Sequence, residues 1–324
     1  MSTENSFEAI DYRLRPAKYA ERLMVSEIVA RSRFHTLTEY QYVGMGSVYF
    51  TDFKLFHRTL GISRLTSIES ADVQDRFTYN KPFNHITLSF GSTATVLPSI
   101  DWSHPALVWL DYDGQISQDK LLDAALVVSR AKSGSFLFFS INAEKPSPKG
   151  MTAVEREKDL VSALRRMVDP ATIPAETKHR DLQGKQARRV YTKLINYMIE
   201  AELARYNAAA KRNGQPTRMW KQVMNLIYKD GATMLTIGGV IHEHEHEEQY
   251  VMSAFNLLST YRGEDSEPLV ITIPKLTPKE MTELESVVAQ DPQGCAVLPF
   301  IPLDDRSNFV RFHRYLPNFV SADI

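Results

Sequence analysis

The stretch YQYVGMGSVYFTDFKLFHRTLGISRLTSIES, residues 40–70, decides the fold of this chain. It opens with a short apolar run at 41–43, turns through the glycines of 44–47, and continues with apolar residues at helical spacing. Gly61 stands where a helix would end, because glycine reaches the left-handed conformation at little cost. A second apolar run then ends in Glu69. This order of strand, glycine turn, helix, strand and acid predicts a nucleotide-binding βαβ unit.

The residue types of this unit fit the binding of a nucleotide. Gly44 and Gly46 would let the backbone come close to a ligand, and the following helix would offer free N–H groups at its N-terminus. Glu69 would accept hydrogen bonds from ribose hydroxyls, and it follows Gly44 by about 25 residues, near the roughly 20 of this layout. The same glycines also suit a tight turn without a ligand, so the neighbouring segments have to decide between the two interpretations.

Composition and charge exclude several classes of protein. Of the 324 residues, 43% are hydrophobic and 24% are charged, values typical of a globular protein with a sizeable core. The formal net charge of -1 gives no overall attraction to nucleic acid or to anionic membranes. The single cysteine, Cys295, excludes an intramolecular disulfide and suits a reducing compartment. Residues 1–15 lack the apolar core of a secretory signal, and no uncharged apolar run reaches transmembrane length. We therefore expect a cytoplasmic protein without a membrane partner.

Strand-like and helix-like segments alternate through the first half of the chain. Strands are expected at 86–90, 106–110 and 136–141, and helical periodicity occurs at 121–131. This alternation predicts an α/β fold with a doubly wound, mostly parallel sheet of the Rossmann-like kind. Ligands of such sheets bind beyond the carboxyl ends of the strands. The polar and glycine-rich clusters of this chain all fall there, at Gly44 to Ser47, Glu69, Gly91 to Thr93, and Asp111 to Gly114.

The expected domain organisation has four parts. They are an N-terminal helical lead-in at 1–35, a cofactor-binding α/β core at 36–150, a helical insertion at 151–230, and the final strands of the sheet with a C-terminal tail at 231–324. The lead-in helix is expected at 16–33. Charges near its start, such as Lys18, could face a ligand, but we favour a solvent-facing position for them. A strand is expected at 234–241, where Gly238-Gly239 indicates a bulge or a close approach. A capping box at 277–280 predicts the start of a late helix.

Three motifs resemble those of class I S-adenosylmethionine-dependent methyltransferases. They are GMGSVYFTDF at 44–53, TSIES at 66–70 and WLDYDG at 109–114, and they are most similar to a group of bacterial O-methyltransferases of undefined function. The likeness covers roughly residues 40–142 and, more weakly, the last strands. It implies a seven-stranded doubly wound sheet, S-adenosylmethionine as the cofactor, and methyl transfer to an unknown acceptor, for which oxygen is one candidate atom.

The resemblance also implies which residues form the site. In this family the first glycine turn lies against the methionine part of the cofactor, and an acid ending the second strand binds the ribose. Residues after the third strand border the adenine, and the loop after the fourth strand lies beside the transferred methyl group. By this resemblance, Gly44, Gly46 and Ser47 form the glycine turn and Glu69 is the ribose-binding acid. Ser92 and Thr93 border the adenine. Asp111, Tyr112 and Asp113 lie beside the methyl group and are the catalytic candidates.

This sequence departs from the family pattern at two positions. The acid that usually precedes the first glycine is replaced by Tyr42-Val43, and the third glycine is replaced by Val48. Asp52, in the following helix, is expected to compensate as a cofactor-binding residue. The departures leave open a catalytically silent protein that binds a nucleotide or a partner on the same fold.

Asp111 is the best candidate for catalytic work. Methyl transfer requires a positioned acceptor and, for oxygen or nitrogen acceptors, removal of a proton. Asp111 ends a buried strand at the expected mouth of the site, although it could also simply cap the next turn. Asp111 and Asp113 could instead hold Mg²⁺ through their oxygens. We favour the first interpretation and expect no metal.

Two charged segments suggest weaker hypotheses. The run HEHEHE at 242–247 would put its histidines on one face of a strand, or His242 and His246 one turn apart on a helix, where they could chelate a metal. We interpret it as a solvated rim. The basic residues at 185–193 could contact phosphates, which leaves a nucleic-acid modifying protein as a further alternative, but a solvated helix face is favoured. A homo-oligomer or a partner protein is compatible with each of these functions.

Overall fold

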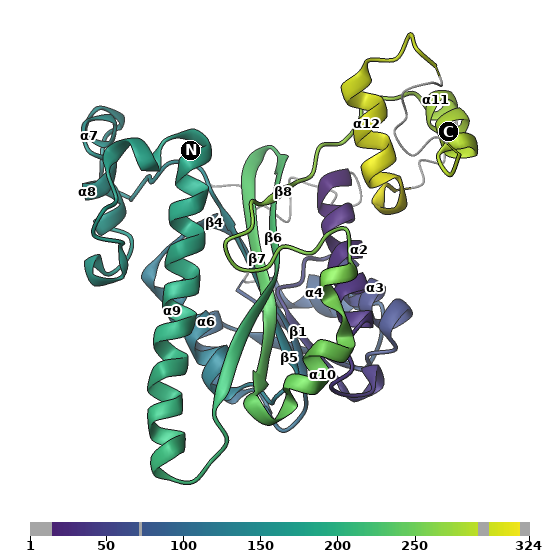
Figure 1. Ribbon diagram of the computed structural model, residues 1–324. Coiled ribbons are helices and arrows are strands. Elements are labelled where there is room, and N and C mark those ends of the chain that lie inside the picture. Colours follow the sequence, from purple (N-terminus) through teal and green to yellow (C-terminus); the bar gives the residue numbers. More distant parts are fainter. Residues whose placement is uncertain (1–14, 71–72, 291–297, 318–324) are drawn as a thin grey trace.

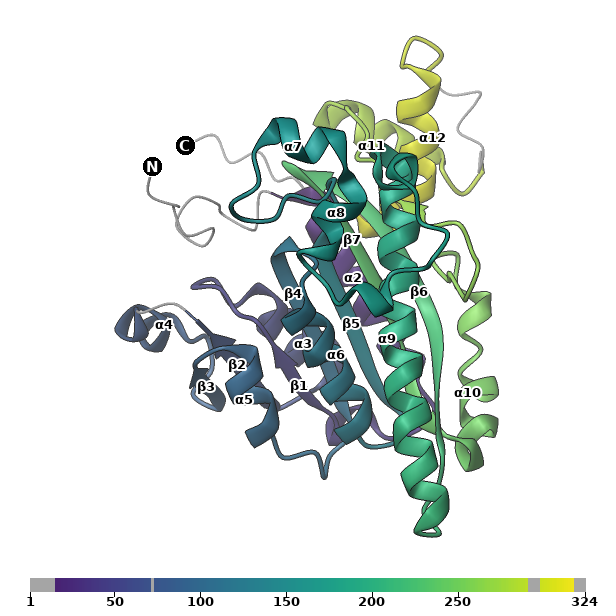
Figure 2. The same cartoon turned by 90° about the vertical axis from the view of Figure 1, so that its left-hand side faces the viewer.

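Residues 15–70, 73–290 and 298–317 are described by the computed structural model. The expected lead-in before Arg15, together with Asp72 and Cys295, lies outside the described residues. One mixed sheet lies between two layers of helices (Figures 1 and 2). Its strands are β1 (Gln41–Gly44), β2 (Arg64–Glu69), β3 (Ile86–Phe90), β4 (Ala106–Gln115), β5 (Ser135–Asn142), β6 (Arg218–Asp230), β7 (Ala232–Glu243) and β8 (Leu269–Val270).

Helices cover both faces of this sheet. α2 and α3 pack on one face, and α6 and α9 pack on the other (Figure 2). The helices are α2 (Pro16–Ala30), α3 (Thr51–Leu60), α4 (Gln74–Asn80), α5 (Thr93–Val96), α6 (Gln118–Arg130), α7 (Ala153–Lys158), α8 (Leu160–Arg165), α9 (Gly184–Arg212), α10 (Glu247–Ser253), α11 (Pro278–Val287) and α12 (Leu303–Phe312). Short 3₁₀ turns extend several of the connections.

The strand order is β3-β2-β1-β4-β5-β7-β6-β8. Strands β1 to β5 are parallel to one another, whereas β7 runs antiparallel between β5 and β6. The chain leaves β1 toward β2 and β3 and then crosses to β4 on the other side, so the order reverses between β1 and β4. The predicted doubly wound, mostly parallel sheet is confirmed. It has one strand more than the seven implied by the resemblance, the two-residue β8.

The glycine-rich stretch folds as the predicted strand, turn, helix and strand. α3 buries Phe53, Phe56 and Leu60 on the face toward the sheet, which is the helical period seen in the sequence. Gly61 follows it with a φ of 70°, and its N–H donates to the carbonyl of His57, as a left-handed C-terminal cap does. Phe50, buried and with a φ of 47°, brings the chain into α3 in a conformation that non-glycine residues seldom adopt.

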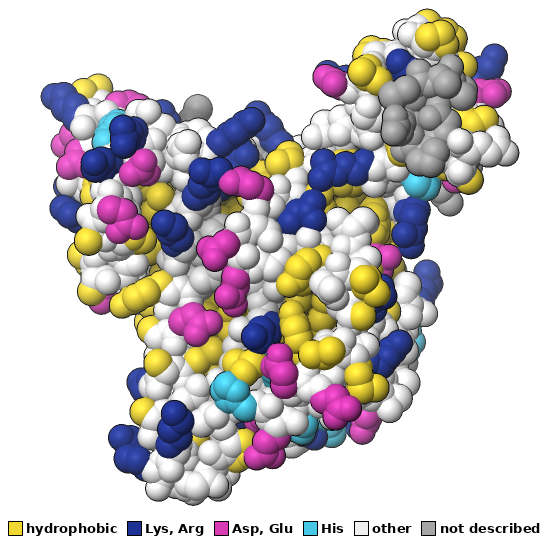
Figure 3. Space-filling view, in the orientation of Figure 1, with side chains coloured by type: hydrophobic (Ala, Val, Ile, Leu, Met, Phe, Trp, Pro, Cys, Tyr) yellow, Lys and Arg dark blue, Asp and Glu magenta, His cyan; other side chains and the backbone are white. Residues whose placement is uncertain are grey.

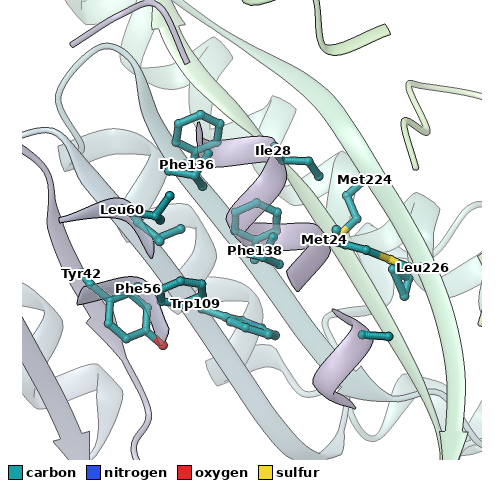
Figure 4. Close-up of a cluster of buried hydrophobic side chains, with 14 of the residues drawn as sticks. Met24, Ile28, Tyr42, Phe56, Leu60, Trp109, Phe136, Phe138, Met224 and Leu226 are labelled. Carbon is teal, nitrogen blue, oxygen red and sulfur yellow. The ribbon is translucent and has the colours of Figure 1, made fainter. Parts of the chain in front are cut away.

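The core on the α2 side is built from aromatic and aliphatic side chains. β5 lies in the middle of the sheet and is buried on both faces, so it reads as a continuous apolar run in the sequence. Figure 4 shows how side chains from two helices and four strands meet above the sheet. Those labelled there are Met24, Ile28, Tyr42, Phe56, Leu60, Trp109, Phe136, Phe138, Met224 and Leu226.

Strand β6 differs from the sequence-based expectation, whereas β7 contains the strand expected at 234–241. β6 pairs along its length with β7, although its residues fall within the range 151–230 that was expected to be helical. A bulge between Gln222 and Met224 breaks its alternation, which is why the sequence did not show a strand there. On β7, the predicted close approach is confirmed, because a Cβ on Gly238 would overlap the ring of Phe138.

The C-terminal helices form a small unit with its own apolar cluster. The predicted capping box is confirmed: the Thr277 hydroxyl accepts from the Glu280 N–H, and the Glu280 carboxylate accepts from the Thr277 N–H. Leu284 of α11 packs with Phe309 of α12, and Figure 1 shows this pair of helices projecting from the edge of the sheet. None of the helices in the described part of the chain combines the length and the apolarity that crossing a bilayer requires.

Candidate active site

A cavity of about 370 Å³ opens at the carboxyl ends of β1, β2 and β4, beside the start of α3. It lies where the strand order reverses, which is where doubly wound sheets bind their ligands. Nine of the ten site residues predicted from the sequence line this cavity. They are Gly46, Ser47, Asp52, Glu69, Ser92, Thr93, Asp111, Tyr112 and Asp113.

The two predicted glycines serve different purposes. Gly44 ends β1 without lining the cavity, and a Cβ there would overlap the phenol of Tyr42. Gly46 lines the cavity, and a Cβ there would overlap Ser67 Oγ and Glu69 Oε1. Glycine at position 46 therefore lets a carboxylate lie against the turn, whereas glycine at position 44 makes room for the aromatic core.

Glu69 ends β2 in the wall of the cavity with only 4% of its surface exposed. The hydroxyl of Ser67 donates to Glu69 Oε1 at 2.5 Å, and the backbone of Gly46 makes a further hydrogen bond to the carboxylate. Burial outweighs both and raises the pKa of Glu69 to about 7. The charged form, which accepts hydrogen bonds from hydroxyl groups, therefore prevails above neutral pH.

Helix α2 supplies an arginine to the cavity that the sequence did not predict. Arg22 lines the cavity and is only 3% exposed, and its Nε donates to Asp52 Oδ1 in a buried ion pair. Asp52 stands in the first turn of α3, so this pair joins the two helices across one side of the cavity. A guanidinium beside a carboxylate can bind a carboxylate and an ammonium group of one ligand together.

A second buried ion pair holds Asp111. Lys18 Nζ lies 2.7 Å from Asp111 Oδ1 and 2.8 Å from Glu21 Oε2, and it stands over the ring of Trp109 at 4.5 Å. Thr236 donates to the other oxygen of Glu21. Burial opposes the charge on Lys18, but Asp111 and Glu21 outweigh it and hold its pKa well above the usual range. One oxygen of Asp111 is therefore held from the interior of the protein by an ammonium group at the wall of the cavity.

The hydroxyl groups of Tyr112 and Thr93 share one carboxylate as their hydrogen-bond acceptor. Both donate to Asp123 Oδ2 on α6, the tyrosine at 2.5 Å. Burial, followed by the charge of Asp123, raises the pKa of Tyr112 above its usual range. Tyr112 thus presents its ring to the cavity while its proton stays bound to the hydroxyl oxygen.

The remaining predicted residues border the outer part of the cavity. The Ser92 hydroxyl accepts a hydrogen bond from the N–H of Thr95 and so caps the start of α5 at this edge of the cavity. Asp113 is exposed and lies near Lys120. Burial lowers the pKa of Lys120 to about 8, although the negative charge of Asp113 opposes this shift. Within the ranges that the structure describes, no group of three or more His, Cys, Asp or Glu side chains is placed to hold a metal ion.

The histidine run adopts neither of the two arrangements considered from the sequence. His242 is the second-last residue of β7, whereas His244–His246 form a 3₁₀ turn. The ring of His242 is fully buried and stacks on that of Tyr250, with 5.5 Å between their centroids, and its burial lowers its pKa. The interpretation as a solvated rim holds for the exposed His244 but is wrong for His242.

Sequence reasoning missed three charged residues around the cavity: Lys18, Arg22 and Asp123. The solvent-facing position favoured for Lys18 is wrong, because its side chain is only 2% exposed. Asp123 lies on the buried face of α6, at a position where an apolar residue is expected. A charge on the apolar face of a helix marks each position as unusual, but it does not identify the partner that makes burial of the charge possible.

Comparison with known proteins supplies a family. The sequence model of the family described as "Putative O-methyltransferase" matches residues 10–324. The chain belongs to this O-methyltransferase family. No match to this chain is found among the curated proteins.

Solved methyltransferases are only distantly similar to this O-methyltransferase family member. An O-methyltransferase from Bacillus cereus, crystallised with S-adenosylhomocysteine, is 10% identical, with 72% of this chain and 84% of that chain covered and a TM-score of 0.37. The N-methyltransferase NodS from Bradyrhizobium japonicum, also with S-adenosylhomocysteine, is 12% identical, with 72% and 96% covered and a TM-score of 0.37. Likeness at this level adds nothing to the family match.

Proposed function

We propose that this chain binds S-adenosylmethionine in the cavity at the carboxyl edge of the sheet and transfers its methyl group to an oxygen atom of an acceptor. The observation that carries the proposal is the position of Glu69. Its buried carboxylate lies against the glycine turn at Gly46, in the same cavity as Asp111. Family membership supplies the reaction class, and the cavity supplies a place for both reactants.

The residues present fit the chemical groups of the cofactor. Glu69 would accept from the ribose hydroxyls, and Ser92 and Thr93 would border the adenine. The Arg22–Asp52 ion pair would hold the carboxylate and the ammonium group of the methionine end. This pair would replace the acid that the family places before the first glycine.

Asp111 is the proposed catalytic residue. S-adenosylmethionine, when bound, supplies a methyl group on a positively charged sulfur. Asp111 would orient the hydroxyl group of the acceptor and accept its proton. Lys18 would position Asp111, because the ammonium group holds Oδ1 from the interior of the protein. The rings of Tyr112 and Phe53, which also line the cavity, would exclude water from the reacting atoms.

Calorimetric titration with S-adenosylhomocysteine tests the cofactor site. We expect one ligand per chain, and we expect Glu69→Ala to weaken binding at least tenfold because the ribose hydroxyls lose their acceptor. Glu248→Ala, which removes an exposed acid of α10, is the matched control and should bind like the wild type. Absence of binding by the wild type, or equal affinity in Glu69→Ala, would refute this site.

Turnover separates the enzyme from a catalytically silent binding protein. Transfer of a labelled methyl group from S-adenosylmethionine to hydroxylated acceptors should be lost in Asp111→Asn, which keeps the shape of the side chain but removes its charge. S-adenosylhomocysteine affinity should change little in this variant. Tight binding with no transfer to any acceptor in a broad panel would favour the silent alternative.

A further inference from the structure

A second cavity, of about 440 Å³, lies between α9, β6 and the loop at 264–268. It shares no lining residue with the candidate active site. Its volume is within the range of about 300–1,000 Å³ that is usual for small-molecule sites. Basic and acidic side chains occur together on the surface between α9 and β6 in Figure 3.

The bulge in β6 aims polar side chains into this cavity. Because two residues of β6 oppose one residue of β7 at the bulge, Gln222 and Asn225 both face α9, although residues three positions apart in a regular strand face opposite sides. Gln222 accepts from Asn196 of α9 and donates to the carbonyls of Arg262 and Gly263. These hydrogen bonds of Gln222 therefore join β6 to α9 and to the segment at 262–263.

Four polar atoms at this cavity are buried and have no hydrogen-bond partner among the described residues. Two are donors, Trp220 Nε1 and Arg188 Nε, and two are acceptors, Asn196 Oδ1 and Asn225 Oδ1. Trp220 is 3% exposed and Asn225 is 4% exposed. Burying polar groups without partners is unfavourable, so four such atoms beside one cavity indicate a ligand that pairs with them.

Charge is distributed unevenly along the cavity. Arg188, Arg189 and Lys193 occupy the N-terminal part of α9, whereas Glu200 lies farther along this helix, near Glu264 of the loop. Arg188 and Glu200 are separated by about 18 Å along the helix axis. A ligand with a negative end and a positive end matches this arrangement.

An exposed ion pair stands at the rim formed by α9 and the loop, between two residues that line the cavity. Arg189 on α9 pairs with Glu267 on the loop, and the two side chains are 58% and 74% exposed. Exposed pairs of this kind contribute little to stability, so opening this one costs little. A ligand could therefore displace this pair at little cost on entering the cavity.

We propose that this cavity binds a short free peptide in an extended conformation. Its terminal carboxylate would lie at Arg188 and its terminal ammonium group at Glu200. An extended peptide backbone alternates N–H donors with carbonyl acceptors, which is what two donors and two acceptors without partners require. About four or five extended residues span the distance between Arg188 and Glu200 once the lengths of these two side chains are subtracted from it.

Nuclear magnetic resonance of the indole N–H groups tests the proposal directly. The chain has three tryptophans, and the indole of Trp109 already donates to Ser140 at 2.9 Å. Titration with tetraalanine should shift the Trp220 indole resonance saturably and leave that of Trp109 in place. A Trp220→Phe variant assigns the resonance.

Variants and blocked peptides test the polarity of the site. Arg188→Gln should weaken tetraalanine binding at least tenfold, whereas Arg212→Gln, at an exposed position near the end of the same helix, should leave it unchanged. Tetraalanine with an acetylated N-terminus and an amidated C-terminus should bind at least tenfold more weakly than the free peptide. Asn225→Leu, which removes an acceptor at nearly constant volume, should also weaken binding.

Several results would overturn the proposal. They are the absence of any Trp220 shift at millimolar tetraalanine, equal binding of the free and blocked peptides, and equal affinity in Arg188→Gln. Saturation by free alanine or by trehalose as effectively as by tetraalanine would show that the cavity takes a different class of ligand. Because Arg188 is only half-buried on a helix surface, its variant keeps the test usable if Asn225→Leu does not fold.

Discussion

Glu69 binds its proton more tightly in the native protein than in the unfolded chain. Burial raises its pKa from 4.5 to about 7, so its contribution to stability is fully present below pH 4.5 and is lost as the pH rises through 7. The free energy of unfolding of the wild type, minus that of Glu69→Gln, should therefore fall by about 2 kcal/mol between about pH 5 and about pH 8. Urea unfolding of both proteins at each pH measures this difference, and a constant difference would contradict the account.

Cofactor binding should show the opposite dependence on pH. Ribose hydroxyls donate to the carboxylate form of Glu69, which prevails above a pH of about 7. The affinity for S-adenosylhomocysteine should therefore increase by about tenfold between about pH 6 and about pH 8. Calorimetry at several pH values measures it. The same slope in Glu69→Gln would assign the effect to another group.

Loss of the Lys18 ammonium group should strongly lower the free energy of unfolding. Lys18→Met leaves the carboxylates of Glu21 and Asp111 without their shared cation, and breaking a buried pair in this way costs about 3–5 kcal/mol. Adding Glu21→Gln removes one of the two excess charges and should recover part of the loss. Chemical denaturation of the single and double variants measures both effects, and a single variant as stable as the wild type would contradict the buried network.

The charged residues of α2 show where sequence-based prediction stops. The helix itself was predictable, because proline at its start and apolar residues at helical spacing indicate one. The sequence could not show that Lys18, Glu21 and Arg22 face the core, because their partners lie on distant elements. Charges are buried only in pairs, and a single sequence does not reveal the pairs.

At the scale of elements, local patterns predicted β3, β5 and β7 well, ended β4 five residues too early, and missed β6. β3 occupies the residues 86–90 predicted for a strand, and β5 extends the predicted strand at 136–141 by only one residue at each end. Both are short runs bounded by turn residues, which is a strong local signal. β6 carries polar residues on the face toward α9 and a bulge in its middle, so it has neither a continuous apolar run nor a regular alternation.

The close approach at Gly238 gives a prediction for the β6–β7 hairpin. A Cβ there would overlap the ring of Phe138 on β5, which is buried among other aromatic side chains and has no room to move. Gly238→Ala should therefore lower the free energy of unfolding by about 1–3 kcal/mol. In Gly114→Ala, the added Cβ meets only the flexible end of Lys120, so this control should be much less affected. Urea unfolding compares the two, and equal effects would contradict the packing argument.

At the scale of the whole molecule, topology explains why the first site was predictable and the second was not. Parallel strands place their carboxyl ends at one edge, so polar residues that follow strands gather there without any further information. The second cavity depends on a helix, a bulged strand and a loop that meet only in three dimensions. No motif in the sequence brings Arg188, Asn225 and Glu264 together.

The crystal structure of the protein grown with S-adenosylhomocysteine tests the central claim most directly. The account predicts the ligand at the carboxyl edge of the sheet, with its ribose hydroxyls on Glu69 and its amino-acid end at the Arg22–Asp52 ion pair. The sulfur atom should face Asp111. Electron density for the ligand elsewhere, or a cavity that stays empty at saturating ligand while Glu69 remains bound to Ser67, would contradict it.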